Sequence, residues 1–127
     1  MVGRRGVVRL FKLLASLFVG GWFVRVLIVD DNEDSRLLQY AAIDGSGYTV
    51  ETAINGRDAL EKAHLLKPNI IVSDILMPEM DGYELCHAVK TDPDLCHIPF
   101  VFYTATYMEP KDKELAYSLG ASRFVVK

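Results

Sequence analysis

The sequence has no long uninterrupted hydrophobic run and very little cysteine. No apolar stretch reaches the roughly 20 residues that a transmembrane helix needs, so we expect no membrane span. Two cysteines, Cys86 and Cys96, are too few for a disulfide framework, and nothing else in the sequence calls for an oxidising compartment. Half of the 127 residues are hydrophobic and 24% are charged, which is typical of a single globular domain and excludes a disordered chain.

Most of the chain is also poor in basic residues. Residues 1–25 carry five basic side chains and no acidic one, whereas residues 26–127 hold nine basic residues against seventeen acidic ones, a net charge of −8. Nucleic-acid-binding domains show a basic surface. We therefore expect no direct nucleic-acid binding by this chain, and the basic, apolar N-terminal segment differs in character from the acidic body.

From residue 24 onward, short apolar runs alternate with segments of helical periodicity. The alternation predicts right-handed β-α-β units, and hence an α/β three-layer sandwich in which helices cover both faces of a five-stranded parallel sheet. The expected strands are 24–29, 48–53, 70–74, 100–104 and 123–126, and the expected helices are 33–43, 56–66, 83–90 and 110–119. In the helix 33–43, we expect the apolar positions to be Leu37, Leu38, Ala41 and Ala42.

Chemically active side chains follow four of these strands. Asp30 and Asp31 come after the first strand, Asp74 ends the third, Thr104 ends the fourth and Lys127 follows the fifth. Ligands of open parallel sheets bind beyond the carboxyl ends of the strands. Three carboxylates, a hydroxyl and an amine are therefore expected to meet at one edge of the sheet.

Such a group of carboxylates needs a counter-charge, because like charges raise one another's pKa values. Mg²⁺ is suited to this role, since it takes oxygen ligands and keeps coordination positions for a phosphate. Asp74 would then remain an anionic nucleophile, while Lys127 and Thr104 supply a cation and a hydrogen-bond donor. This combination is what phosphoryl transfer requires.

In this order and spacing, the residues closely resemble the response-regulator receiver domain of two-component signalling. The motifs that carry the resemblance are Asp30-Asp31, Asp74-x-x-Met77-Pro78-x-x-x-Gly82, Thr104-Ala105, Lys127, the segment 55–60 and Ile98-Pro99. The resemblance covers about residues 24–127 and implies a flavodoxin-like strand order, 2-1-3-4-5.

The resemblance implies that Asp74 accepts a phosphoryl group from a phosphohistidine on a sensor histidine kinase or phosphotransfer protein. Asp31, Asp74 and the backbone carbonyl of Leu76 would ligate Mg²⁺, with Asp30 acting mostly through water. The chain would be a cytoplasmic switch, not an enzyme with an external product. Because Leu76 cannot hydrogen-bond an attacking water, we expect a long-lived phosphoaspartate.

It further implies that Thr104, Lys127 and the backbone N–H of Ala105 hold the phosphoryl oxygens. Family members change conformation through the threonine and an aromatic residue of the fifth strand, here Phe124. Phenylalanine lacks the hydroxyl of the tyrosine often found at that position, so one hydrogen bond of the switch is missing.

Other functions fit the sequence less well. A haloacid-dehalogenase-like phosphatase needs an acid two residues after its nucleophile, but Leu76 follows Asp74 and Asn32 follows Asp30 at that spacing. A dinucleotide-binding domain needs a glycine-rich turn after the first strand, which is absent. The adjacent Cys-His pairs at 86–87 and 96–97 do not match zinc-site spacings. A receiver-like interaction module that works without phosphorylation remains the main alternative.

The two ends of the chain depart from the family pattern. Receiver domains continue after the lysine with a proline and a fifth helix, whereas this sequence ends at Lys127. Residues 5–19 instead carry an amphipathic helical pattern, followed by Gly20-Gly21. We divide the chain into an N-terminal helical extension, 1–23, and a receiver domain without its final helix, 24–127.

Our hypothesis is that this N-terminal helix occupies the place of the missing fifth helix. It would pack on its own chain, with residues 20–23 as the bridge, or on a neighbouring chain, which would make a dimer. The alternatives are a membrane-surface anchor formed by residues 1–22, a secretion signal, or a misassigned start of translation. A secretion signal does not suit a domain that is phosphorylated from intracellular ATP.

Overall fold

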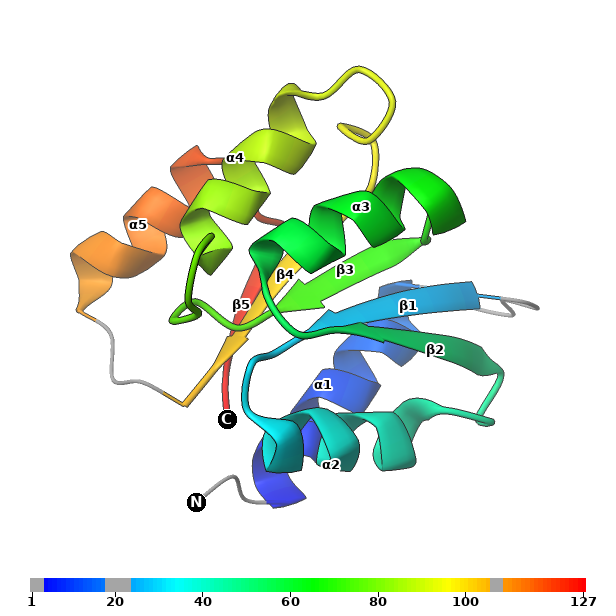
Figure 1. The fold of residues 1–127 in the computed structure, drawn as a ribbon. Coiled ribbons are helices and arrows are strands. Elements are labelled where there is room, and N and C mark those ends of the chain that lie inside the picture. The colour runs from blue at the N-terminus through cyan, green and yellow to red at the C-terminus, as the bar shows by residue number, and fades with distance from the viewer. Residues whose placement is uncertain (1–3, 18–23, 106–108) are drawn as a thin grey trace.

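The computed structural model describes residues 4–17, 24–105 and 109–127, which form a five-stranded parallel sheet between two layers of helices (Figure 1). The strand order is β2-β1-β3-β4-β5, as expected. The elements are α1 (Arg4–Leu17), β1 (Val24–Val29), α2 (Glu33–Ile43), β2 (Tyr48–Ala53), α3 (Gly56–Leu66), β3 (Ile70–Ser73), α4 (Gly82–Thr91), β4 (Phe100–Thr104), α5 (Pro110–Ser118) and β5 (Arg123–Val126).

The predicted architecture is confirmed, and the helices divide between the two faces of the sheet. Helices α3, α4 and α5 cover one face, and α1 and α2 cover the other (Figure 1). The central strands β3 and β4 are buried throughout because both of their faces are covered, which explains why they read as continuous apolar runs. None of the helices in the described ranges is long and apolar enough to cross a membrane.

Helix α2 packs on the sheet through a face that is only partly the expected one: Leu38 and Ala42 pack against the core, but Leu37 does not. Leu37 is 56% exposed, whereas Ser35, Gln39 and Ile43 are buried. These three residues are spaced four apart and therefore form one stripe along the helix. The expectation that Leu37 belongs to the apolar face is wrong, because the first turns of α2 pack beside the polar carboxyl ends of the strands.

Helix α1 packs on the sheet of its own chain. Val7, Leu10 and Leu14 are buried in the same apolar cluster as residues of β1, β3 and β4. At the edge of the sheet, the Arg9 guanidinium donates a hydrogen bond to the carbonyl oxygen of Val126 at 3.0 Å. The packing that we expected of the N-terminal helix is thus confirmed within one chain, while the expected bridge, residues 20–23, lies outside the described residues.

Side-chain caps fix where the helices that follow the strands begin. Asn32 accepts a hydrogen bond from the backbone N–H of Ser35, and Asn55 accepts one from that of Asp58. The cap of α2 is therefore Asn32 and neither of the aspartates that precede it. Because Asn32 caps the helix, Asp30 and Asp31 are available for other contacts at the end of β1.

Candidate functional site

Two aspartates lie at the carboxyl ends of neighbouring strands. The backbone N–H of Asp30 donates to the carbonyl oxygen of Ala53 at 3.1 Å, and that of Asp74 donates to Val29 at 2.9 Å. These bonds extend the parallel ladders of β1 with β2 and of β3 with β1 by one residue. Sheet hydrogen bonding therefore holds the two carboxylates at the same edge.

The Lys127 ammonium joins these two carboxylates. Its Nζ lies 2.8 Å from Asp30 Oδ2 and 3.0 Å from Asp74 Oδ2, and only 2% of the lysine side chain is exposed. The Lys127 backbone N–H donates to the carbonyl oxygen of Thr104 at 2.8 Å, so pairing with β4 places the lysine at the end of β5. A buried cation is thus shared between two carboxylates, which gives each of them the partner that burial requires.

The two carboxylates differ in their access to solvent. Asp30 is fully buried, and its Oδ1 accepts a hydrogen bond from the backbone N–H of Asn32 at 3.0 Å. Asp74 keeps 14% of its side chain exposed, and its Oδ1 accepts from the backbone N–H of Ile75 at 2.7 Å. Asp74 is therefore the carboxylate of this pair that a ligand can reach from outside.

The remaining sequence-predicted site residues surround this pair. Asp31 and Leu76 are exposed beside Asp30 and Asp74, and Ala105 is exposed directly after β4. Thr104 is buried as the last residue of β4. The structure brings Asp30, Asp74 and Lys127 into direct contact and places the other four residues on the adjoining strand ends and loops.

Sequence reasoning missed two polar residues of the site. Ser35 and Gln39, each 2% exposed, lie on the buried stripe of α2. Lys127 Nζ donates to Ser35 Oγ at 2.8 Å, and Gln39 Nε2 donates to Asp30 Oδ2 at 3.1 Å. The signal in the sequence is the spacing of Ser35, Gln39 and Ile43, which lie four residues apart and so share one face of the helix. The leucines of the same helix are more hydrophobic, and the prediction followed them.

A loop closes around the Asp74 backbone on the other side. The backbone N–H of Gly82 donates to the carbonyl oxygen of Ile75 at 2.8 Å, and the backbone N–H of Gly56 donates to that of Met80 at 3.2 Å. Glu79, within the loop, adopts a positive φ of 66°. The loop 75–82 is thus closed by a hydrogen bond between its own ends and joined by another to the start of α3.

Two aromatic side chains on β4 and β5 lie near the site. The Tyr103 hydroxyl has no hydrogen-bond partner among the described residues, and burial raises the pKa of Tyr103 to about 12. Phe124, the aromatic residue expected to take part in the switch, is half-buried, with its ring centroid 6.2 Å from that of Phe102 and Lys113 Nζ 5.6 Å from it. Its surroundings are those of a packed apolar residue.

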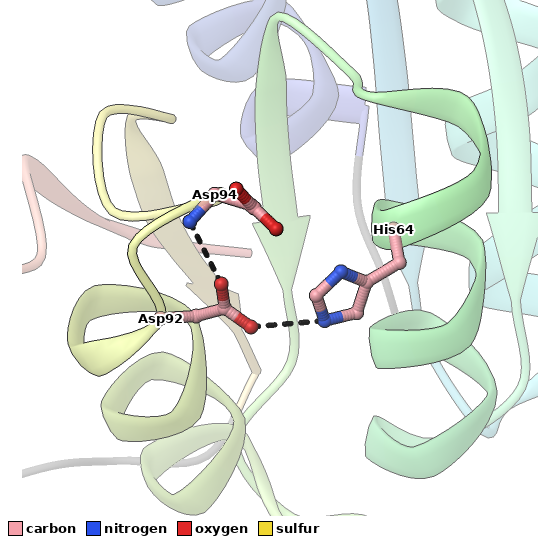
Figure 2. A group of neighbouring side chains, drawn as sticks. All are labelled: His64, Asp92 and Asp94. Atoms are coloured by element: carbon pink, nitrogen blue, oxygen red, sulfur yellow. Dashed lines mark hydrogen bonds and ion pairs between the residues drawn. The ribbon is translucent and has the colours of Figure 1, made fainter.

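A second group of possible metal ligands lies away from this site. His64, Asp92 and Asp94 offer ligand atoms within 4.8 Å of one another, near the C-terminal ends of α3 and α4 (Figure 2). His64 Nε2 lies 2.9 Å from Asp92 Oδ2, and Asp92 Oδ1 accepts from the backbone N–H of Asp94 at 2.8 Å. These contacts account for the arrangement without a metal.

A family model described as the response regulator receiver domain matches residues 26–127. Among curated proteins, the chain is 40% identical over 103 residues to the response regulator PleD of Caulobacter vibrioides. This match covers 81% of this chain and 22% of PleD. It is 39% identical over 104 residues to the alkaline phosphatase synthesis transcriptional regulatory protein PhoP of Bacillus subtilis, covering 81% of this chain and 42% of PhoP. The chain thus spans less than half the length of these relatives.

Solved structures show the same fold. The chemotaxis protein CheY4 of Vibrio cholerae superposes with a TM-score of 0.78 at 34% identity, covering 83% of this chain and 87% of CheY4. The receiver domain of a signal transduction histidine kinase from Syntrophus aciditrophicus gives a TM-score of 0.74 at 36% identity, covering 82% of this chain and 78% of that domain. By sequence and by fold, this chain belongs to the response regulator receiver domain family.

Proposed function

We propose that this chain is a phosphoacceptor domain that takes a phosphoryl group onto Asp74. The observation that carries the proposal is the buried Lys127 ammonium held between the carboxylates of Asp30 and Asp74. Asp74 is the more accessible of the two, and it sits where ligands of open parallel sheets bind. The donor would be a phosphohistidine on a sensor histidine kinase or a phosphotransfer protein.

The donor set at this edge fits Mg²⁺. Asp74 keeps part of its side chain exposed, and Asp31 stands exposed beside it and the buried Asp30. Carboxylates and a backbone carbonyl are the ligands that this hard cation prefers. We propose that Asp31, Asp74 and the carbonyl of Leu76 hold the ion, with Asp30 acting mostly through water. The bound ion would neutralise charge on the phosphoryl oxygens.

The transfer itself needs a carboxylate oxygen of Asp74 as nucleophile. That oxygen forms a bond to phosphorus while the bond from phosphorus to the donor imidazole nitrogen breaks, and the bonding electrons stay with the imidazole. Lys127 would exchange its contact with Asp74 Oδ2 for one with a phosphoryl oxygen. The Thr104 hydroxyl and the Ala105 backbone N–H, on the neighbouring strand end, would donate to the others.

The consequence of phosphorylation would be a change of conformation at β4 and β5. The Lys127 backbone N–H is hydrogen-bonded to Thr104, and Lys127 follows β5, so a phosphoryl group held by both residues would link Asp74 to the ends of both strands. Such a switch releases no product of its own, and the domain would not be an enzyme. We place it in the cytoplasm, where a kinase charged by ATP operates, and expect no direct contact with nucleic acid.

We further propose that residues 1–23 serve this domain as a structural extension. Helix α1 covers the face of β1, β3 and β4 that would otherwise expose apolar side chains to water. Val7, Leu10 and Leu14 are engaged on the sheet, so this face of the helix is not available to a membrane. The proposed division remains a receiver domain over 24–127, with α1 as a covering helix.

Phosphorylation can be tested with a small acyl phosphate as donor and intact-protein mass as readout. The wild-type protein is expected to gain one phosphoryl group with Mg²⁺ and little with a chelator in its place. Asp74→Asn is expected to gain none, whereas Asp94→Asn, at an exposed aspartate in the turn after α4, should behave as wild type. Stoichiometric labelling of Asp74→Asn would contradict the assignment of the acceptor.

The alternative is a module that binds partners without phosphorylation. A Lys127 side chain displaced from the site would favour it, but the ammonium is buried and hydrogen-bonded to both carboxylates. Absence of labelling in the wild-type protein, in the presence of Mg²⁺, would favour this alternative.

A further inference from the structure

Helix α2 places two uncharged polar side chains in the interior beside the site. Ser35 and Gln39 are as buried as the apolar core around them. Burial of such groups costs free energy unless they are hydrogen-bonded. Their hydrogen-bond partners therefore indicate what the two residues do, and both bond to the Lys127–Asp30 pair.

Ser35 completes the surroundings of the lysine. A lysine ammonium has three N–H donors. In Lys127 they meet three acceptors, Asp30 Oδ2 at 2.8 Å, Ser35 Oγ at 2.8 Å and Asp74 Oδ2 at 3.0 Å. Two of the three anchors, Asp30 and Ser35, are independent of Asp74 and can keep the ammonium in place when its third contact is given to another oxygen.

Gln39 holds both of these anchors. Its Nε2 donates to Asp30 Oδ2 at 3.1 Å, and it lies 3.2 Å from both Ser35 Oγ and the Ser35 carbonyl oxygen. A carboxylate can only accept, so the amide must turn its NH₂ group toward Asp30. Gln39 therefore fixes the carboxylate and the hydroxyl that fix the lysine.

We propose that Ser35 and Gln39 are positioning residues that hold the Lys127 ammonium on the Asp30 side of the site, ready for a phosphoryl oxygen. The proposal rests on the proposed function for its consequence, the capture of a phosphoryl group on Asp74. The positioning itself is a property of the protein before any phosphorylation, so the two can be tested separately.

The first test measures the accessibility of Lys127 without any phosphodonor. Reductive methylation followed by peptide mass analysis reports how fast each amine reacts. The matched pair is Ser35→Thr and Ser35→Val, which have nearly the same shape and differ by the hydroxyl. We expect Lys127 to remain protected in wild type and Ser35→Thr, and to react at least severalfold faster in Ser35→Val and in Gln39→Leu.

Two lysines serve as internal controls in the same experiment. Lys90, whose Nζ donates to the Ile98 carbonyl oxygen at 2.6 Å, should remain protected in every variant unless the fold is lost. Lys111, with 77% of its side chain exposed, should react equally in all of them. Equal protection of Lys127 in Ser35→Thr and Ser35→Val, with Lys90 protected, would overturn the positioning role of Ser35, and protection in Gln39→Leu that of Gln39.

The second test measures phosphorylation of the same variants by acyl phosphate with Mg²⁺. We expect Ser35→Thr to be labelled within about twofold of the wild-type rate and Ser35→Val about tenfold more slowly, as for the loss of one charge-assisted hydrogen bond. Equal rates for Ser35→Thr and Ser35→Val, beside a labelled wild type, overturn the inference and leave the proposed function standing. An unlabelled wild type counts against the proposed function, and the methylation rates then decide the positioning role alone.

Discussion

Gly6 of α1 lies against the backbone of Lys127, the residue whose side chain bridges the two buried carboxylates. A Cβ atom at Gly6 would approach the Lys127 Cα to 2.7 Å and the Tyr103 hydroxyl oxygen to 2.8 Å. Ordinary carbon–carbon contacts are about 3.5–4.0 Å. The absence of a side chain at this position is therefore what allows α1 to lie directly on the end of β5.

Gly6→Ala tests this close approach. Alanine favours a helix over glycine by about 1 kcal/mol, but overpacking against backbone atoms costs about 1–3 kcal/mol. We expect a net loss in the free energy of unfolding, measured by urea denaturation. Ser16→Ala, an exposed position on α1, serves as the control and should leave stability nearly unchanged. A Gly6→Ala protein more stable than wild type would contradict the packing.

Leu14→Ala tests whether the packing of α1 contributes to stability. Leu14 is fully buried in the core, and truncating such a leucine to alanine costs about 2–5 kcal/mol of stability. Val8, on the same helix, is 48% exposed, so Val8→Ala should cost far less. Urea denaturation of both variants gives the comparison. Equal small losses would mean that α1 does not rest on the sheet in solution.

The strands and the charged centre of the site could be predicted because their signals are local. An apolar run ends at Asp30 and another at Asp74, and parallel pairing brings the carboxyl ends of β1 and β3 to one edge. For α1, the sequence could predict a buried apolar face but not which surface that face packs on. An amphipathic pattern shows that one side of a helix is buried and does not identify its partner.

The buried polar stripe of α2 could not be predicted either, because its partners lie elsewhere in the chain. Leucines are stronger apolar signals than serine and glutamine, and hydrophobic periodicity therefore included the exposed Leu37 and left out the buried Ser35 and Gln39. The buried Ser35 is hydrogen-bonded to Lys127, a residue 92 positions away. No pattern within the helix reports such a distant partner.

Gly82→Ala tests the loop that closes on the acceptor. A Cβ at Gly82 would overlap the carbonyl oxygen of Asp74 and lie 2.9 Å from the Ile75 Cα, so the backbone at the site must shift. We expect lower stability together with a large loss of phosphorylation by acyl phosphate. Gly47→Ala is the control: Gly47 has a φ of 89° but nothing within 4 Å of the added carbon, so stability should fall while labelling persists. Normal labelling of Gly82→Ala would contradict the expectation.

Leu76→Asn tests the persistence of the proposed phosphoaspartate. Leu76 is 62% exposed two residues after Asp74, and its side chain cannot orient a water for attack on phosphorus. An amide at this position can, so we expect severalfold faster release of phosphate from the labelled protein. Leu65→Asn, at a still more exposed leucine on α3, should leave the rate unchanged. A wild-type phosphoaspartate lost within seconds would contradict the assigned role of Leu76.

The alkaline limit of stability should depend on Cys86. Burial raises the pKa of this thiol from 9.0 to about 11, because the thiolate would lose its hydration in the core. Above pH 9 the thiol of the unfolded chain ionises while that of the folded chain keeps its proton, so the unfolded state binds fewer protons. The free energy of unfolding must then fall as pH rises, by up to about 1.4 kcal/mol per pH unit.

Cys86→Ala removes this contribution, and we expect the fall between pH 9 and about 11 to become shallower. The measurement is the free energy of unfolding in urea at several pH values across this interval. Cys96→Ala removes an exposed thiol and should reproduce the wild-type slope. A residual fall is expected in Cys86→Ala, since burial also raises the pKa of Tyr103, from 10.0 to about 12, and this lowers stability over the same pH range. Identical slopes in Cys86→Ala and wild type would show that the Cys86 thiol ionises as readily in the folded protein as in the unfolded chain.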